Sequence, residues 1–284
     1  MSARTDLASE SQYITGGETP KGVDVKEERS DAARLSITRI EIKTDEASRR
    51  IGRPKGRYMT LRASDGSFEA EADCFNERAA LLAREIAALL PADMSRGALF
   101  AGLGNRQITP DSVGPLAADR ILATRHIESH ILKELGELAK MSVISPGVLA
   151  QTGLESAEII KMIAQSIDPS VIIVCDAFAC SDPENLGTTV QLCDTGISPG
   201  SGVGNSRAEI SLRTMGVPCI AAGIPTVADI DAVAEKHDAA LDGMVITPGR
   251  IDTIVKHGSM LISLAVNMAV HSSLTAEEIN ALVG

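Results

Sequence analysis

The sequence predicts an α/β protein with a mostly parallel, twisted sheet, helices on both faces and a small appended β element. Short apolar runs alternate with helical patterns through the middle of the chain, which is typical of parallel strands joined by right-handed crossovers. Aromatic residues make up only 2% of the 284 residues, so aliphatic side chains must build the interior. A hydrophobic content of 44% is enough for one substantial core.

The individual elements follow from hydrophobic periodicity. Alternating apolar residues predict the first strands, and continuous apolar runs predict buried parallel strands. The predicted strands are 35–42, 57–61, 97–103, 141–144, 171–175 and 217–222. The predicted helices are 70–90, 112–123, 129–138, 155–166, 227–236, 250–270 and 275–282. Thr275 and Glu278 have the spacing of a capping box at the start of the last helix.

The domain organisation predicted is a flexible arm over residues 1–31, followed by a single domain over 32–284. The arm is polar and lacks hydrophobic periodicity. Its start has no apolar core of signal-peptide length, and no run of about 18 apolar residues follows elsewhere. The five cysteines include no C-x-x-C pair, so we expect reduced, mostly buried thiols in a cytoplasmic protein.

The net charge of −11 argues against general affinity for nucleic acids, because phosphate binding depends on clustered Lys and Arg. An acidic protein suits a basic or neutral polypeptide partner, although solubility alone also explains the sign of the charge.

Two aspartates stand near the carboxyl ends of predicted strands, where open α/β sheets collect ligands. Asp176 follows the run 171–175 directly, and Asp111 lies eight residues past Leu103 at the start of a predicted helix. Asp111 alone is explained equally well as a helix N-cap, and Asp176 as a structural hydrogen-bonding group. Two carboxyl groups brought close share one proton, so the pair could activate water and protonate a leaving amine.

Three further patterns suggest other chemistry. Asp194-Thr195-Gly196 matches the tripeptide of pepsin-like proteases, but one copy in an α/β context indicates that Asp194 braces a loop. The glycine-rich run 198–205, with Gly200, Ser201 and Gly202, lacks phosphate-loop spacing and is expected to be a substrate-facing or structural loop. His126 and His130 lie four residues apart without the acidic partner of a zinc motif, so no metal site is expected.

Taken together, several motifs resemble the germination proteases of spore-forming Firmicutes. The similar stretches are in order and span nearly the whole chain: RTDLASE (4–10), GRYMTL (56–61), GLGN with TPDSVGP (102–115), TRH (124–126), SPGVLAQTGLES (145–156), TTVQLCDTGISPGSGVGNSR (188–207) and GVPCIAAGIPTV (216–227). Cys175, Phe178 and Cys180 depart from the smaller or aliphatic residues expected of the family, which bears on substrate preference and subunit contacts.

The resemblance implies an atypical aspartic endopeptidase with a fold similar to that of hydrogenase-maturation peptidases. It assigns the catalytic roles to Asp111 and Asp176 and requires no cofactor or metal. It also implies a precursor that cleaves itself and then degrades small acid-soluble spore proteins in the forespore and spore core, as a homotetramer. Because the family's cleavage site resembles T-E-F/I-A-S-E, residues 5–10 predict self-cleavage between Asp6 and Leu7, with residues 1–6 as the propeptide.

Two alternatives remain open from the sequence. A metal-dependent maturation peptidase of the same architecture would use Asp111, Asp176 and His126 to hold a divalent ion. A nucleotide-binding oxidoreductase or binding module would instead use the glycine-rich run 198–205.

Overall fold

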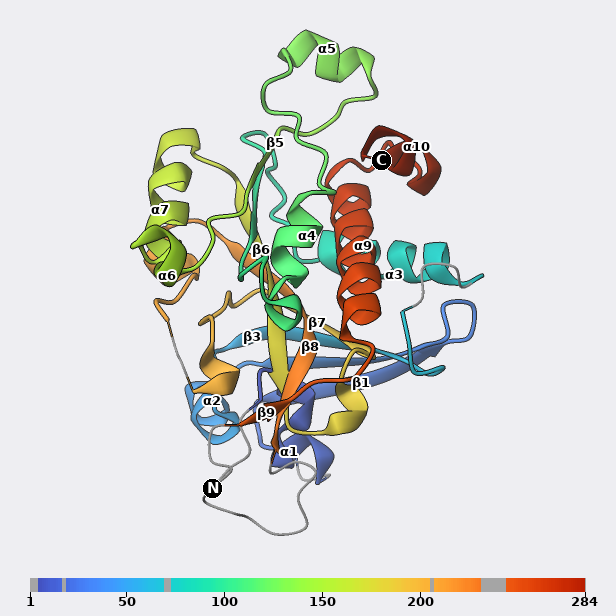
Figure 1. The fold of residues 1–284 in the computed structure, drawn as a ribbon, viewed down its shortest axis with the longest axis vertical. Coiled ribbons are helices and arrows are strands. Elements are labelled where there is room, and N and C mark those ends of the chain that lie inside the picture. Colours follow the sequence, from blue (N-terminus) through green and yellow to red (C-terminus); the bar gives the residue numbers. More distant parts are fainter. Residues whose placement is uncertain (1–4, 17–18, 69–72, 205–206, 231–243, 284) are drawn as a thin grey trace.

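The structure is a computed structural model that describes residues 5–16, 19–68, 73–204, 207–230 and 244–283. Its strands form one sheet in the order β1-β2-β3-β7-β8-β6-β4-β5, with β9 paired to β8 (Figure 1). The strands are β1 (Val23–Ser30), β2 (Leu35–Ile42), β3 (Gly56–Ala63), β4 (Ala98–Gly102), β5 (Met141–Ile144), β6 (Val171–Cys180), β7 (Thr189–Cys193), β8 (Cys219–Asp229) and β9 (Val245–Ile246).

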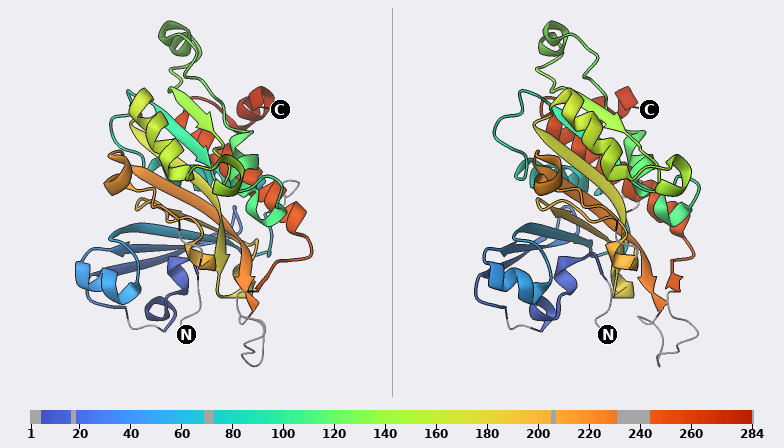
Figure 2. Two further views of the ribbon diagram at one scale, coloured as in Figure 1. Left: turned by 60° about the vertical axis from the view of Figure 1, so that its left-hand side comes forward. Right: turned by 90° about the vertical axis from the view of Figure 1, so that its left-hand side faces the viewer.

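The sheet has a parallel part and an antiparallel part. Strands β5, β4, β6 and β8 run parallel to one another, whereas β1, β2, β3 and β7 pair antiparallel up to β8. Figure 2 shows β1, β2 and β3 as a layer below the parallel strands. The predicted α/β class is confirmed, and its antiparallel part is larger than expected because β1, β7 and β9 were not predicted.

The helices connect and cover these strands. They are α1 (Gln12–Thr15), α2 (Asp45–Ile51), α3 (Phe75–Ala87), α4 (Val113–Ala118), α5 (Ser129–Glu134), α6 (Leu149–Thr152), α7 (Ser156–Ile167), α8 (Leu212–Met215), α9 (Ile251–Val270) and α10 (Ala276–Val283). Short 3-10 helices are η1 (Ala8–Glu10), η2 (Thr109–Asp111), η3 (Pro183–Asn185) and η4 (Ser201–Val203).

Both faces of the parallel part are buried. Successive side chains of a strand point to opposite faces, so in β4 Phe100 joins the core formed with α3, α4 and α9, and Leu99 joins the core formed with α7. Figure 1 shows α7 on one side of these strands and α4 and α9 on the other. This explains the continuous apolar runs in the sequence, because neither face of these strands meets water.

Helix α9 is long and apolar enough in composition to cross a membrane. Two thirds of its most apolar window is buried inside the fold, where the helix packs on α3, α4 and β8. A core helix of a globular domain accounts for this composition.

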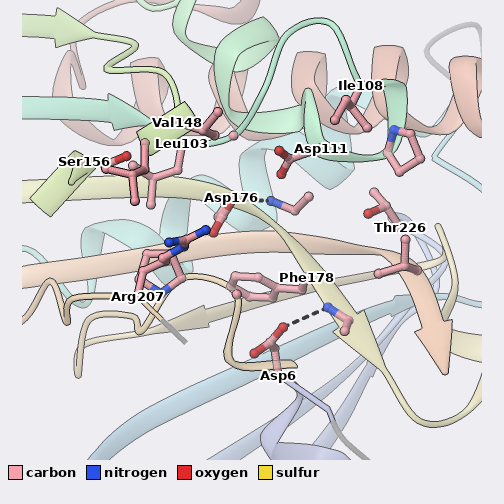
Figure 3. Close-up of a pocket in the computed structure, with 18 of the residues that line it drawn as sticks. Asp6, Leu103, Ile108, Asp111, Val148, Ser156, Asp176, Phe178, Arg207 and Thr226 are labelled. Carbon is pink, nitrogen blue, oxygen red and sulfur yellow. Dashed lines mark hydrogen bonds between the residues drawn. The ribbon is translucent and has the colours of Figure 1, made fainter. Parts of the chain in front are cut away.

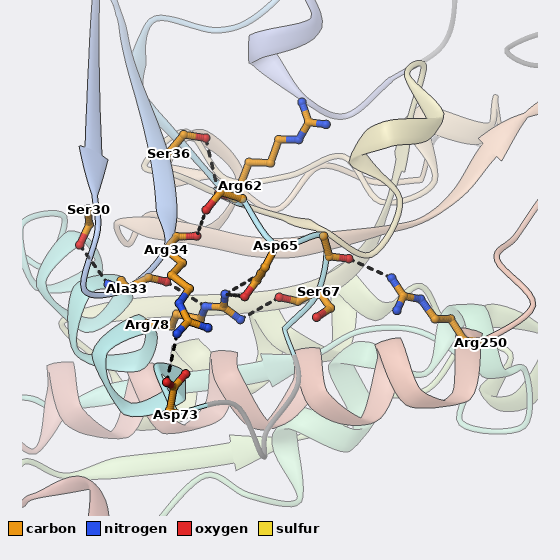
Figure 4. Close-up of polar contacts among 12 residues, drawn as sticks. Ser30, Ala33, Arg34, Ser36, Arg62, Asp65, Ser67, Asp73, Arg78 and Arg250 are labelled. Atoms are coloured by element: carbon orange, nitrogen blue, oxygen red, sulfur yellow. Dashed lines mark hydrogen bonds and ion pairs between the residues drawn. The ribbon is translucent and has the colours of Figure 1, made fainter.

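A buried arginine joins α3 to the antiparallel layer (Figure 4). Arg78 is completely buried, and its guanidinium donates to the carbonyl oxygens of Ala33 and Ser67 at 2.9 and 2.8 Å. It also pairs with both carboxylate oxygens of Asp65 at 2.7 and 2.6 Å. A buried charge needs such complete pairing, so this network ties the helix to the turns that follow β1 and β3.

Three features differ from the sequence-based expectations. Residues 5–16 and 19–31 carry regular structure in place of a flexible arm: β1 pairs along its length with β2, and Leu7 is buried. The helix predicted over 227–236 begins inside β8, and residues 231–236 lie outside the described residues. Strand β6 continues to Cys180, so Asp176 lies within the strand and not after it.

Candidate active site

The segment between β4 and α4 positions Asp111. After β4 the chain turns at Gly104, whose φ of +112° favours glycine and whose Cβ would lie 2.0 Å from the Asp111 carbonyl oxygen. The turn directs the N–H of Asn105 to the Asp111 carboxylate at 2.8 Å. Asp111 ends η2, which begins at Thr109 and contains Pro110. The sequence TPD therefore forms a short, rigid element that returns the carboxylate toward the sheet.

Strand β6 positions Asp176. The pairing of β6 with β4 ends at Cys175, which is opposite Gly102, while its pairing with β8 continues, so that Asp176 lies opposite Gly223. Asp176 is the first residue of β6 beyond the last residue of β4, and it is only 6% exposed. The sequence analysis placed Asp176 at the carboxyl end of a strand. In the structure it lies where β4 ends, although β6 itself continues.

The two aspartates line one pocket of about 520 Å³ (Figure 3). Apolar side chains, among them Leu103, Ile108 and Phe178, form much of its wall. Figure 3 shows Asp111 and Asp176 on the same side of the pocket, above the ring of Phe178. The geometry therefore brings together the two carboxyl groups that the sequence singled out.

Burial raises the pKa of both carboxyl groups. For Asp176 burial raises the pKa well above its usual value, the charges of Asp111 and Asp6 raise it further, and a hydrogen bond from the N–H of Ala177 opposes them. Burial also raises the pKa of Asp111, against a hydrogen bond from Asn105. Asp176 is the more deeply buried of the two, and the charge of Asp111 opposes its ionisation, so the state in which Asp176 holds the proton while Asp111 ionises is favoured.

A pair in this state can exchange protons with a bound molecule in both directions. The ionised member accepts a proton and the neutral member donates one. The apolar wall strengthens such interactions because it lowers the local dielectric.

The predicted cleavage segment lies at the same pocket. Asp6 lines the pocket together with Asp111 and Asp176, and Figure 3 shows it on the opposite side of the Phe178 ring from Asp176. The side-chain amide of Gln191 donates to the Asp6 carbonyl oxygen at 2.7 Å. That oxygen belongs to the peptide bond between Asp6 and Leu7.

Comparison with known proteins identifies the family. The family model described as germination protease matches residues 3–242. A germination protease from Caldanaerobacter subterraneus is 34% identical, and the match covers 100% of this chain and 98% of that protein. One from Clostridium tetani is 35% identical over 99% of both chains, and one from Priestia megaterium is 38% identical over 90% of this chain and 68% of that protein. The chain belongs to the germination protease family.

As a germination protease the chain is a peptidase, a hydrolase of peptide bonds, and its family acts in spore germination. Among solved structures, a NiFe-hydrogenase maturation protease from Thermococcus kodakarensis is similar, with a TM-score of 0.36 and 15% identity over 64% of this chain and 98% of that chain. The family assignment rests on the sequence matches.

The glycine-rich run 198–205 of this germination protease and Asp194, which precedes it, have different surroundings. Asp194 is not among the residues that line the pocket, and it accepts hydrogen bonds from the backbone N–H and Nε of Arg57 at 2.8 and 2.7 Å. Gly200 lines the pocket. Ser201 donates to an Asp6 carboxylate oxygen at 2.9 Å, and a Cβ on Gly202 would lie 2.2 Å from the other oxygen, so only glycine leaves room there.

The other candidates lie elsewhere. His126 and His130 are both exposed, and His130 pairs with Glu128 at 3.2 Å. Among the residues that the structure describes, no group of three or more His, Cys, Asp or Glu side chains could hold a metal ion. All five cysteines are free and buried, as expected.

Sequence reasoning missed three polar residues of the germination protease pocket region. Arg207 and Glu155 both line the pocket and form an ion pair at 3.7 Å, and Gln191 binds the segment that carries Asp6. Arg207 and Gln191 lie in the family-like stretch 188–207, but no spacing rule distinguishes them from their neighbours. Their positions depend on contacts between distant parts of the chain.

Proposed function

We propose that this germination protease is an aspartic-type endopeptidase in which Asp111 and Asp176 activate water, and that it begins the degradation of small acid-soluble spore proteins during germination. The observation that carries the proposal is the pair of carboxyl groups from separate segments in one pocket, with the pKa of both raised by burial. The family assignment supports spore germination as the setting.

In this mechanism the ionised Asp111 takes a proton from water as the water oxygen adds to the carbonyl carbon of the peptide. The neutral Asp176 hydrogen-bonds the carbonyl oxygen, on which negative charge develops. Collapse of the tetrahedral intermediate breaks the C–N bond, and the leaving nitrogen takes a proton from the pair. The products are a carboxylic acid and an amine, which ionise to a carboxylate and an ammonium group by exchanging a proton, and the pair again holds one proton.

The same proposal includes self-processing. The chain is a precursor that cleaves itself between Asp6 and Leu7, and this role is supported by the position of Asp6 in the pocket of the two aspartates. The mature enzyme acts without a cofactor, as a homo-oligomer, in the cytoplasm of the forespore and in the spore core.

The deciding experiment follows the amino terminus by mass spectrometry at mildly acidic pH. Wild type is expected to lose residues 1–6, and Asp111→Asn and Asp176→Asn to slow this loss by about 10²- to 10⁴-fold, the usual contribution of an acid or base. Asp168→Asn is the matched control, because Asp168 is an exposed residue with positive φ, a conformation that Asn also tolerates. Unchanged processing in either pocket variant would refute the mechanism.

The same assay tests the metal-dependent alternative. We expect a chelator to leave the rate unchanged, because proton transfer between two carboxyl groups needs no ion. Loss of activity in chelator and its recovery with a divalent cation would favour the metal-dependent peptidase. Thermal stabilisation by nucleotides without self-cleavage would favour the binding module, although Ser201 and Gly202 in the glycine-rich loop contact Asp6 in the structure.

A further inference from the structure

Residues 5–10, here called the N-terminal segment, are bound along the end of β6 by their backbone groups. The N–H of Asp6 donates to the carbonyl oxygen of Ala179 at 2.8 Å. The side-chain amide of Gln191 donates to the Asp6 carbonyl oxygen at 2.7 Å and accepts from the N–H of Ala8 at 2.6 Å. One amide group therefore binds the peptide groups on both sides of Leu7, as a neighbouring strand would.

The side chains of Asp6 and Leu7 in this segment also occupy fitted sites. The Asp6 carboxylate accepts hydrogen bonds from the N–H of Ala179 at 2.8 Å and from Ser201 Oγ at 2.9 Å. Leu7 is 1% exposed and packs in a cluster with Phe178, Cys180 and Ala228. Phe178 and Cys180 therefore form an apolar site for the side chain that follows the bond proposed to be cleaved.

Glu10 occupies a third site, here called the carboxylate site. One of its carboxylate oxygens accepts from the N–H and the Oγ of Ser181, each at 2.7 Å. The other accepts from the N–H of Asp182 at 3.0 Å and from Nδ2 of Asn185 at 2.7 Å. Asn185 is itself buried, at 8% exposure, and its Oδ1 accepts from Thr189 at 3.1 Å, which holds Nδ2 toward Glu10.

Four donors that converge on two oxygens select an ionised carboxylate. A glutamine at the same place would direct its own NH₂ group at donors, and both sides would lose a hydrogen bond. Sites that hydrogen-bond a side chain reject an analogue that leaves their polar groups unpaired.

We propose that the N-terminal segment occupies the substrate-binding groove in cis, and that Ser181, Asp182 and Asn185 form the site that recognises a glutamate four residues after the acidic residue of the cleaved bond. The acidic and apolar pattern of the bound peptide is that of the cleavage site implied by the family resemblance, and the proposal adds the groups of the protein that bind its second acidic side chain. This inference rests on the proposed peptidase function. It follows that the N-terminal segment competes with substrate peptides from other molecules for the same groove.

The first test compares two synthetic peptides that copy residues 2–14, with Glu or with Gln at the position of Glu10. Wild type is expected to cleave the Glu peptide with a kcat/KM about 10- to 100-fold higher, the ratio typical of hydrogen bonds to a charged group. Asn185→Asp keeps the acceptor for Thr189 and repels a glutamate, so we expect it to abolish or reverse this preference. Ser181→Ala, which removes one donor, is expected to reduce the preference about threefold or more.

Asn76→Asp is the matched control, because Asn76 is exposed on α3 and the change adds the same charge outside the groove. It should retain the wild-type preference. Equal cleavage of both peptides by wild type, or an unaltered preference in Asn185→Asp and in Ser181→Ala, would overturn the carboxylate site and leave the peptidase function standing. Cleavage of neither peptide by wild type would instead count against the peptidase function itself.

The second test measures competition in the full chain with Asp176→Asn, so that the N-terminal segment stays uncut. A fluorescent form of the Glu peptide is titrated with this protein, with and without Glu10→Gln. Loss of the segment's own contacts should tighten binding of the peptide about tenfold, because the groove is freed. An identical Kd in both proteins would overturn occupation of the groove in cis.

Discussion

At the scale of single residues, the main feature is the burial of an acid on a strand. Asp176 is buried among apolar side chains and near Asp111, so its neutral form is favoured in the folded protein. In the unfolded chain its pKa has the ordinary value near 3.8. The native state therefore binds more protons than the unfolded state at pH values between the two pKa values.

The stability of the protein should reflect this difference. Because the folded pKa of Asp176 is raised, its contribution to stability is fully present below the unfolded pKa and is lost as pH rises through the folded pKa. Asp176→Asn keeps an oxygen that accepts the hydrogen bond from the N–H of Ala177, and it removes the loss of stability at high pH because Asn does not ionise. We expect the free energy of unfolding of the variant, measured in urea, to rise relative to wild type between pH 4 and pH 7, by about 1.4 kcal/mol for each unit between the two pKa values. A pH-independent difference for Asp176→Asn would contradict the assignment.

At the scale of elements, close packing of α4 against the strand ends places η2 beside β6. A Cβ on Gly114, in the first turn of α4, would lie 2.2 Å from the Leu103 carbonyl oxygen and 2.4 Å from that of Cys175. The N–H of Leu103 also donates to the Cys175 carbonyl oxygen at 2.8 Å. The absence of a side chain at this position is what allows the helix to approach both strands.

Gly114→Ala tests this packing. We expect a loss of about 1 to 3 kcal/mol in the free energy of unfolding, as for other overpacked sites, and slower self-processing because η2 moves with the helix. Gly249→Ala is the control, since a Cβ there meets nothing within 4 Å and should leave stability and processing unchanged. A neutral result for Gly114→Ala would mean that backbone shifts relieve the contact without cost.

The buried elements could be predicted from the sequence more readily than the exposed ones. Strands β4 and β6 were predicted because two buried faces produce an unbroken apolar run. Strand β1 was missed because most of its side chains are exposed and polar, and its place in the sheet depends on pairing with β2. In the site, Asp111 and Asp176 were predicted from their position after apolar runs. Gln191 was not, because its contacts with Asp6 and Ala8 join residues more than 180 positions apart.

At the scale of the whole molecule, the amino-terminal residues belong to the folded unit. Leu7 and Ala8 are each 1% exposed, and the chain then enters β1 at the edge of the sheet. Composition predicts the opposite, because a polar segment buries little apolar surface of its own. Here β6 and β8 supply the apolar surface that covers Leu7, and β1, β2 and β3 supply much of the surface that covers Ala8.

Hydrogen exchange measures this ordering directly. In full-length Asp176→Asn, we expect the amides of Asp6 and Ala8, which are bonded at 2.8 and 2.6 Å, to exchange at least about tenfold more slowly than in a free peptide that copies residues 2–14. Equal rates in the protein and the peptide would show that the segment is not held.

Strand β6 carries a proposed reacting group, Asp176, and Ser181 of the carboxylate site directly follows its last residue. Asp176 and Ser181 are five residues apart on nearly continuous extended backbone, a span of about 16 Å. The length of this extended backbone therefore fixes the distance between the recognised side chain and the bond to be cleaved. Inserting or deleting one residue between Asp176 and Ser181 would turn every following side chain to the other face of the strand. The distance between the cleaved bond and the recognised side chain therefore cannot change by one residue without also changing which groups face the peptide.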